Sequence, residues 1–253
     1  MTATTPALRP APRGVTAEAV LVGRSVRHSL RDVEVLLMSV LLPVFMMFLF
    51  TFIFGGALDP SGAYVNYVVP GILLLCAGFG AASTAVSVAI DSRMGFIDRL
   101  RTMPVRASAV LTGHVVASLL RNLVATAIVL GVAMMLGFRP QASPFDWLLT
   151  VVVIAVYILT VTTLFAAIGL AAAGPESASG YGFVLLFLPY LSSAFVPVET
   201  MPAWLQWFAE HQPITPVIET IRALLQGDSD PAIFMEIADQ LPLTLIPIER
   251  INA

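Results

Sequence analysis

Long apolar runs separated by short polar links dominate the hydrophobic pattern of this chain. An α-helix needs about 20 residues to cross the hydrocarbon core of a bilayer. Five runs approach or exceed that length, over residues 35–56, 67–90, 108–137, 147–173 and 180–196. The pattern therefore predicts an all-α, polytopic integral membrane protein with five transmembrane helices.

Two amphipathic segments do not fit a spanning helix. Residues 16–33 place valines and leucines on one helical face and arginines off it, which is typical of a helix lying on the membrane surface. A helix packed on its own protein is the alternative, and it stays open. Residues 201–226 carry Trp204, Trp207 and several prolines, and their aromatic content suits the membrane–water interface.

Composition strengthens the membrane interpretation. Of 253 residues, 58% are hydrophobic and only 11% charged, whereas a soluble domain has about a quarter charged residues. We expect a disordered cytoplasmic tail over residues 1–14, one transmembrane domain over 15–227 and an atypical tail over 228–253. The single Cys76 lies within an apolar run, which excludes a disulfide framework or a thiolate metal site.

Charge predicts the orientation in the membrane. The arginine-rich segment, residues 91–108, contains Arg93, Arg99, Arg101 and Arg106. Arginines before the first run would face the same side, while the opposite links contain only Arg139. Cytoplasmic loops collect such residues, so we expect a plasma (inner) membrane protein with a cytoplasmic N-terminus. The segment is either a solvated loop that sets topology or a short amphipathic helix, ending before Pro104, that docks a soluble partner.

Arg121 lies about a turn and a half inside the third predicted span. Charged side chains within a span are costly, and they either snorkel to the interface or line a pathway. We favour snorkelling to the cytoplasmic interface over a role in a pathway.

Motifs for intrinsic enzymatic chemistry are absent from the sequence. There is no G-x-x-x-x-G-K-[ST] phosphate loop, no H-E-x-x-H helix and no G-x-S-x-G elbow, and His28, His114 and His211 are scattered. The spans have no mid-membrane carboxylate of the kind that ion-coupled carriers use. We therefore expect no catalytic residue, no metal, no cofactor and no nucleic-acid partner, and energy for any active transport must come from another protein.

Three motifs, in order along the chain, resemble those of a known family. Residues 95–100 (Gly-Phe-Ile-Asp-Arg-Leu), followed by Pro104, resemble the Gly-x-x-(Glu/Asp)-Arg-Leu…Pro pattern between the second and third spans of ABC-2 family exporter permeases. Residues 174–178 (Gly-Pro-Glu-Ser-Ala) resemble their Asn-Pro-Glu-Ala turn, with Gly174 in place of Asn. Residues 195–206 and 213–216 resemble the external segment after their fifth span. The daunorubicin/doxorubicin-resistance branch is the most similar.

This resemblance implies a membrane-spanning permease subunit without ATPase activity. Two copies, identical or paired with a related permease, would assemble with two copies of a separate ABC ATPase and contact membrane lipids. The exported substrates would be amphiphilic drugs, polyketides or lipids. The coupling helix would bind the ATPase through Arg93, Gly95, Ile97, Asp98, Arg99, Leu100 and Pro104. The candidate pathway or interface residues are Arg121, Glu176, Glu199 and Trp204.

The end of the chain departs from the family pattern. A sixth span is the norm, but residues 229–253 contain several acids and three prolines with no apolar run long enough to cross. Five spans from a cytoplasmic start would leave the C-terminus outside, and a truncation or frameshift would explain the difference. The alternative function is a non-transporting or degenerate membrane scaffold that still binds an ATPase.

Overall fold

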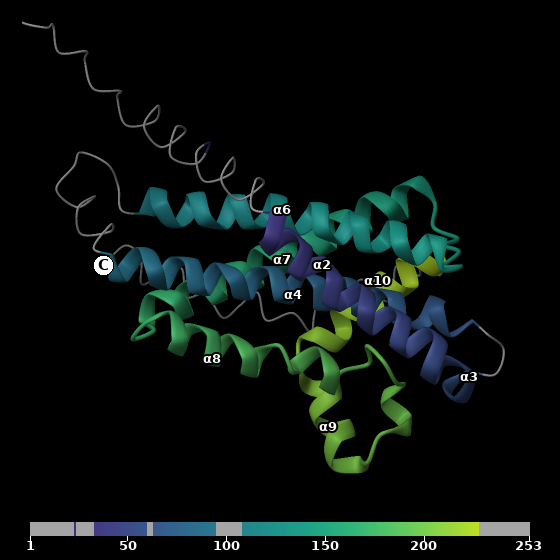
Figure 1. The fold of residues 1–253 in the computed structure, drawn as a ribbon. Helices are drawn as coiled ribbons and strands as arrows, with labels where there is room; N and C mark the ends of the chain where they lie inside the picture. The colour runs from purple at the N-terminus through teal and green to yellow at the C-terminus, as the bar shows by residue number, and fades with distance from the viewer. Residues whose placement is uncertain (1–22, 24–32, 60–62, 95–107, 228–253) are drawn as a thin grey trace, which may run out of the picture.

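A computed structural model describes residues 23, 33–59, 63–94 and 108–227 of the chain. All regular structure in these residues is helical, as predicted (Figure 1). The predictions for the tail over 1–14, for most of the surface helix over 16–33, for residues 95–107 and for the tail over 228–253 lie outside the described residues.

Four helical segments are long and apolar enough to cross a membrane, and they correspond to the first four predicted spans. They comprise Leu36–Leu58 (the α2, η1 and α3 helices), Tyr64–Arg93 (α4), Thr112–Met135 within α6 (Ser108–Met135), and Pro144–Ala171 (α7). Within the first segment, α2 (Val33–Phe48) passes into a π-helical stretch, η1 (Leu49–Phe54), and a final turn, α3 (Gly55–Leu58).

The fifth predicted span is not a continuous helix. Its residues fall in α8 (Pro175–Leu185), in a 3₁₀ turn η2 (Leu188–Leu191), and in an irregular segment after it. Pro189 has no N–H to donate to the carbonyl of Leu185, the residue at which α8 ends. Among the described residues, the structure therefore contains four candidate spans and not five.

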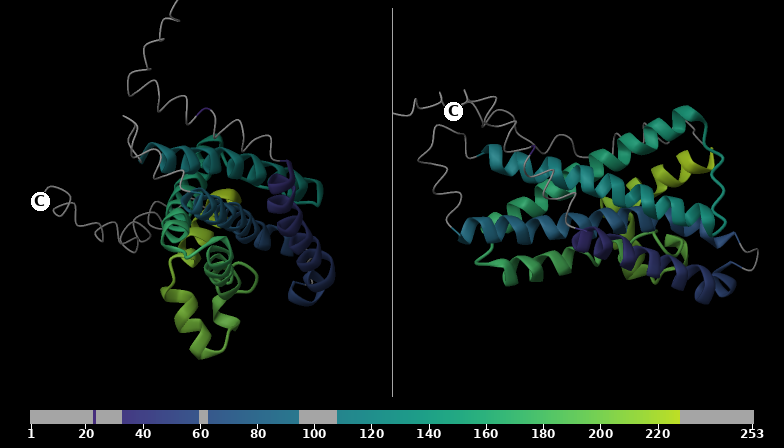
Figure 2. Two further views of the ribbon diagram at one scale, coloured as in Figure 1. Left: turned by 60° about the vertical axis from the view of Figure 1, so that its left-hand side comes forward. Right: turned by 45° about the horizontal axis from the view of Figure 1, so that its top comes forward.

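The α4 helix is the centre of the bundle. It packs against α2, α6, α7, α8 and α10 (Figure 2). In its most apolar 18-residue stretch 72% of the residues are buried, compared with 17% in the first span. The first span therefore presents most of its apolar surface outward, to lipid or to another membrane protein.

Small residues let α4 approach α7 and α8 closely. Ala81, Ala85 and Ala89 are buried together with Phe165 of α7 and Ala178 of α8. Where α7 crosses α4, a Cβ added at Gly169 would lie 2.4 Å from the backbone oxygen of Ala85. Small residues at these positions thus allow the helix backbones to approach closely.

The single cysteine completes a hydrogen bond that a proline leaves open. Pro43 lies inside α2 and cannot donate to the carbonyl of Ser39. The thiol of Cys76, buried on α4, donates to that same oxygen at 3.4 Å. Cys76, for which the sequence indicated no role, therefore joins α2 to α4 through this hydrogen bond.

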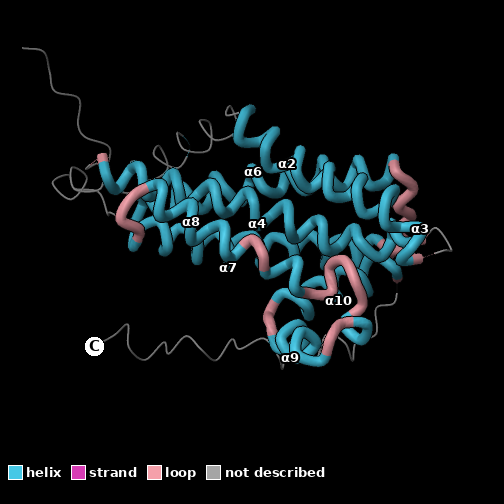
Figure 3. The backbone as a smooth tube through the Cα atoms, turned by 60° about the horizontal axis from the view of Figure 1, so that its bottom comes forward, coloured by secondary structure: helices cyan, strands magenta, loops and turns pink. Residues whose placement is uncertain are grey.

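The predicted amphipathic region forms two short helices, α9 (Ala203–His211) and α10 (Ile214–Gln226), preceded by the 3₁₀ turn η3 (Val198–Thr200). Figure 3 shows α9 and its flanking loops gathered beside α10. Trp204 and Trp207 on α9 are exposed, whereas α10 buries an apolar face against α4 and α7. Gly227 ends α10 in the left-handed conformation, with φ of 76°.

Candidate functional site

Arg93 and the predicted turn over residues 174–178 meet at one end of the bundle, which we call the Arg93 end. Here α4 ends and α6 and α8 begin (Figure 1). The guanidinium of Arg93 lies against the turn before α8, because a Cβ at Gly174 would be only 3.0 Å from its Nη2. Glycine in place of the family's asparagine leaves room for this contact. Glu176, in the first turn of α8, is exposed at the same end.

A side-chain contact between α4 and α6 was not predicted from the sequence. His114 Nε2 of α6 lies 2.8 Å from Asp91 Oδ2 of α4. The two residues are 23 positions apart, and no spacing motif connects them. The pair joins the two helices that lead into and out of the arginine-rich segment.

A polar layer lies between α4 and α6 further into the bundle. Arg121 is buried, and its Nη2 donates to the backbone oxygen of Gly80 at 3.0 Å and to Ser83 Oγ at 2.7 Å. The snorkelling interpretation is therefore wrong, because the guanidinium turns toward α4. A Cβ at Gly80 would lie 1.4 Å from Asn122 Oδ1, so only glycine accommodates this layer.

The same layer contains three further polar side chains that bond to one another. Ser118 Oγ accepts from Thr84 Oγ1 at 2.8 Å and from Asn122 Nδ2 at 3.2 Å. Buried polar groups inside a bilayer need partners within the protein, since no water is available there. The layer thus ties α4 to α6 through mutual hydrogen bonds.

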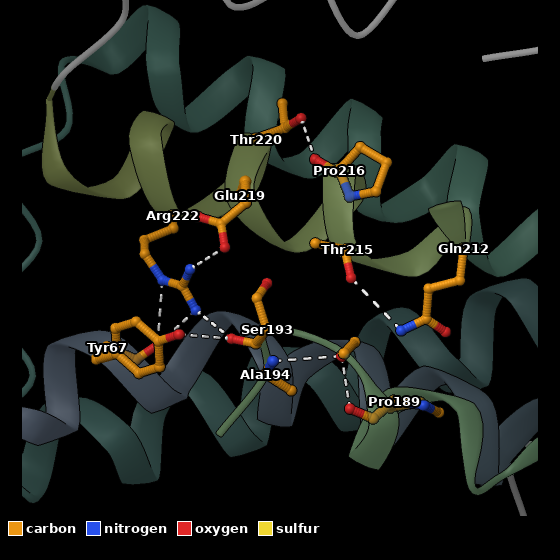
Figure 4. Close-up of polar contacts among 11 residues, drawn as sticks. Tyr67, Pro189, Ser193, Ala194, Gln212, Thr215, Pro216, Glu219, Thr220 and Arg222 are labelled. Atoms are coloured by element: carbon orange, nitrogen blue, oxygen red, sulfur yellow. Dashed lines mark hydrogen bonds and ion pairs between the residues drawn. The ribbon is translucent and has the colours of Figure 1, made fainter. Parts of the chain in front are cut away.

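A second buried arginine organises the opposite end of the bundle, which we call the Arg222 end (Figure 4). Arg222 of α10 donates through Nη2 to the backbone oxygens of Ser193, at 2.8 Å, and of Tyr67, at 3.2 Å. Its guanidinium lies 3.9 Å from the centre of the Tyr67 ring, and its Nη1 donates to Glu219. One side chain thus connects α10, α4 and the chain after η2.

The segment 191–196, which begins at the last residue of η2, is held mainly by side chains from its neighbours. Three alternate backbone oxygens accept hydrogen bonds from them: Leu191 from Gln212 Nε2 at 2.7 Å, Ser193 from Arg222 and from the Tyr67 hydroxyl at 2.9 Å, and Phe195 from the Tyr64 hydroxyl at 2.6 Å. On the α4 side, a Cβ at Gly71 would lie 2.5 Å from Ala194 Cβ. The segment therefore rests directly on the α4 backbone.

Arg222, Tyr64 and Tyr67 were not among the predicted site residues. One signal was present, because Arg222 shares a helical face with Ile218 and Leu225, and an arginine on an apolar face needs buried partners. The four predicted pathway or interface residues do not converge. Arg121 lies in the middle layer and Glu176 at the Arg93 end, while Glu199 on η3 and Trp204 on α9 are exposed near the Arg222 end. Gly95, Ile97, Asp98, Arg99, Leu100 and Pro104 lie outside the described residues.

Within the part of the chain that the structure describes, no three His, Cys, Asp or Glu side chains are grouped to hold a metal ion. The described polar groups link helices to one another: Arg121 and the Ser118–Thr84 hydroxyl pair join α6 to α4, and Arg222 joins α10 to α4. Such linkages suit a protein that changes the relative positions of its helices.

Most of the chain is similar in sequence to known proteins. A family model described as ABC-2 type transporter matches residues 16–225. The daunorubicin resistance ABC transporter permease protein DrrB1 of Streptomyces coeruleorubidus is 32% identical over 190 residues, which cover 74% of this chain and 67% of the relative. The probable doxorubicin resistance ABC transporter permease protein DrrC of Mycobacterium tuberculosis is 26% identical over 201 residues, covering 78% of this chain and 72% of the relative.

Proposed function

The chain belongs to the ABC-2 type transporter family, and from that premise we propose that it exports amphiphilic drugs, polyketides or lipids with energy from a separate ATPase. The family resemblance seen in the three motifs is confirmed, and the chain is a multi-pass membrane permease subunit of an ABC transporter. The observation that carries the proposal is the family match over residues 16–225, which includes all four candidate spans, together with the likeness to permeases named for daunorubicin or doxorubicin resistance.

The distribution of carboxylates supports an external energy source. Within the described spans, Asp91 and Asp146 lie near helix ends, and no carboxylate occupies the middle. Asp146 is engaged in the capping box of α7, where it accepts from the N–H and hydroxyl of Ser143. A proton- or sodium-coupled carrier would need an acid at mid-membrane. ATP hydrolysis by a partner removes that requirement.

The ATPase would bind at the Arg93 end. Arg93 and Glu176 are exposed there, and residues 95–100 carry the family's coupling motif between α4 and α6. Charged contacts of this kind steer association and fix the register of a complex. By this proposal the Arg93 end, and with it the N-terminus, faces the cytoplasm.

The crevice found between the described helices of one chain is too small to hold a drug-sized substrate. An apolar crevice of about 90 Å³ lies between α4, α6, α7 and α10, beside Trp147 and Thr150. Sites for drug-sized ligands have volumes of about 300–1,000 Å³, so this crevice is too small for such a substrate. We place the path instead between two copies, which would meet through outward-facing apolar surface such as that of α2 and α8.

Efflux measurements with a coupling variant test the proposal. We expect a host without its own drug pumps to lose accumulated daunorubicin when it produces this permease together with its partner ABC ATPase. The double change Asp98→Ala/Arg99→Ala should lower the efflux rate at least tenfold without lowering the amount of permease in the membrane, because it removes both charges of the motif.

The matched control is Arg139→Ala/Glu210→Ala, which removes one cation and one anion that are exposed away from the Arg93 end. This control should export normally. Normal efflux and normal co-purification of the ATPase with the Asp98/Arg99 variant would refute the coupling role. Stable binding of the ATPase by the unaltered chain, with no export of any amphiphile tried, would favour the scaffold.

Orientation is tested separately by cysteine labelling. Cys76 has no exposed surface, so the unaltered protein should give little background with a membrane-impermeant maleimide. We expect Ala63→Cys, before α4, to react in intact cells, and Ser92→Cys, near the end of α4, to react only after permeabilisation. The reverse pattern would invert the proposed topology.

A further inference from the structure

The segment 191–196 lies across the most buried helix of the bundle and, after Leu191 at the end of η2, has no regular secondary structure. It connects η2 with the region of η3 and α9, and its residues 192–195 are buried. Buried backbone oxygens require hydrogen-bond donors, and in helices and sheets the backbone supplies them. Here side chains donate instead: Gln212 to the Leu191 oxygen, Arg222 of α10 to the Ser193 oxygen, and Tyr64 of α4 to the Phe195 oxygen. A segment held in this way can be released by moving a few side chains.

Arg222 is the donor that joins the most elements. Ser193 O receives hydrogen bonds from both Arg222 and Tyr67, and Arg222 also contacts the carbonyl and the ring of Tyr67 (Figure 4). The planar fork of a guanidinium can bond two oxygens and stack on an aromatic ring at once, which an ammonium group cannot reproduce. Its Glu219 partner is 45% exposed, against 9% for Arg222, so the pair has one side open to the surroundings.

The contact with α4 depends on the absence of a side chain at position 71. A Cβ there would approach Ala194 Cβ to 2.5 Å and the Ala194 backbone oxygen to 2.8 Å. Backbone atoms cannot rotate away from such a contact. Any side chain at Gly71 would therefore push the segment off α4.

From this geometry we propose that Arg222 is a positioning residue that holds segment 191–196 closed over the Arg222 end of α4, and that the segment leaves α4 when the permease opens outward. The second half of this statement rests on the proposed export function. The first half does not, because it concerns only which side chains keep the segment in place. The same release would shift α8 and α9, which the segment connects.

Ser193 supplies a reporter for the position of the segment. Its side chain is buried and its hydroxyl makes no hydrogen bond in the structure, while its backbone oxygen receives the contacts from Arg222 and Tyr67. Ser193→Cys therefore introduces a thiol without removing any hydrogen bond that the serine hydroxyl makes. Cys76, also buried, reports on the core of the bundle in the same molecule.

The experiment measures the maleimide reaction rates of both thiols in membranes that contain the full chain and no ATP. In the Ser193→Cys protein both should react slowly. Adding Arg222→Met should raise the rate at position 193 at least tenfold and leave Cys76 protected, and Gly71→Ala should do the same by a steric route. Arg222→Lys should be intermediate. Gly131→Ala is the matched glycine control, because nothing lies within 4 Å of the added Cβ, and it should change neither rate.

Two results would overturn the positioning role. The thiol at position 193 could stay protected in both the Arg222→Met and Gly71→Ala proteins, or Cys76 could become reactive together with it, which would indicate general loss of structure. Addition of ATP and the ATPase partner then tests outward opening, and we expect faster labelling at position 193 in the otherwise unaltered chain. Faster labelling in Arg222→Met without any effect of ATP would keep the positioning role and refute the link to ATP-driven export.

Discussion

Arg121→Glu will be far less stable than Arg121→Met, although the methionine variant loses the charge altogether. The guanidinium donates to Gly80 O and Ser83 Oγ inside the bundle. A carboxylate at this position would bring an acceptor against the Gly80 oxygen, with its charge buried. Leaving a buried charge without compensation costs about 3–5 kcal/mol, whereas replacement by an apolar side chain of similar volume is often nearly neutral.

Thermal unfolding of the purified permease in detergent, together with the amount of protein in the membrane, measures this difference. Arg121→Lys completes the series, because a snorkelling side chain would tolerate lysine fully. In the buried layer, the Arg121→Lys protein should lose part of its stability. A lysine ammonium group cannot reproduce the planar arrangement of N–H donors that the guanidinium directs at Gly80 O and Ser83 Oγ. Equal stability of the glutamate and methionine variants would contradict the buried position.

Gly169→Ala will separate α4 and α7, which approach each other through backbone atoms at this position. The added Cβ would lie 2.4 Å from Ala85 O and 3.0 Å from Ala85 Cα, so relief requires α7 to move away from α4. Overpacking of a core costs about 1–3 kcal/mol. We expect the upper end of that range, because the obstacle is backbone.

The matched substitution is Gly131→Ala on α6, where the new methyl group meets no atom within 4 Å. It should be neutral or slightly stabilising, because alanine is favoured over glycine within helices by about 0.5–1 kcal/mol. The comparison uses the midpoint of thermal unfolding of the two proteins in one detergent. A similar midpoint for both would show that the crossing of α4 and α7 is looser than the structure indicates.

The spans were predictable because each depends on a local property. A helix that crosses a bilayer satisfies its backbone within itself and must be apolar over about 20 residues, so the sequence of one segment is enough to recognise it. The family motifs, being short and ordered along the chain, also needed no tertiary information.

The interruption of the fifth span shows where local reasoning begins to lose accuracy. Pro189 was visible within the apolar run, but prolines also occur within α2 and α4, which continue through them. Whether a helix continues past a proline depends on what satisfies the carbonyl that the proline leaves without a donor. At Pro43 the thiol of Cys76 supplies that donor from another helix.

The sequence by itself therefore determined that the chain is a helical membrane permease of a recognisable family, with its first four spans and an amphipathic region over residues 201–226. Only the tertiary structure decided where the two buried arginines point and what they hold. Arg222 bonds residues 155 and 29 positions away, and Arg121 bonds an oxygen 41 positions away. Neither set of partners follows a helical period, because a buried cation is satisfied by whichever backbone oxygens the packed helices bring near it.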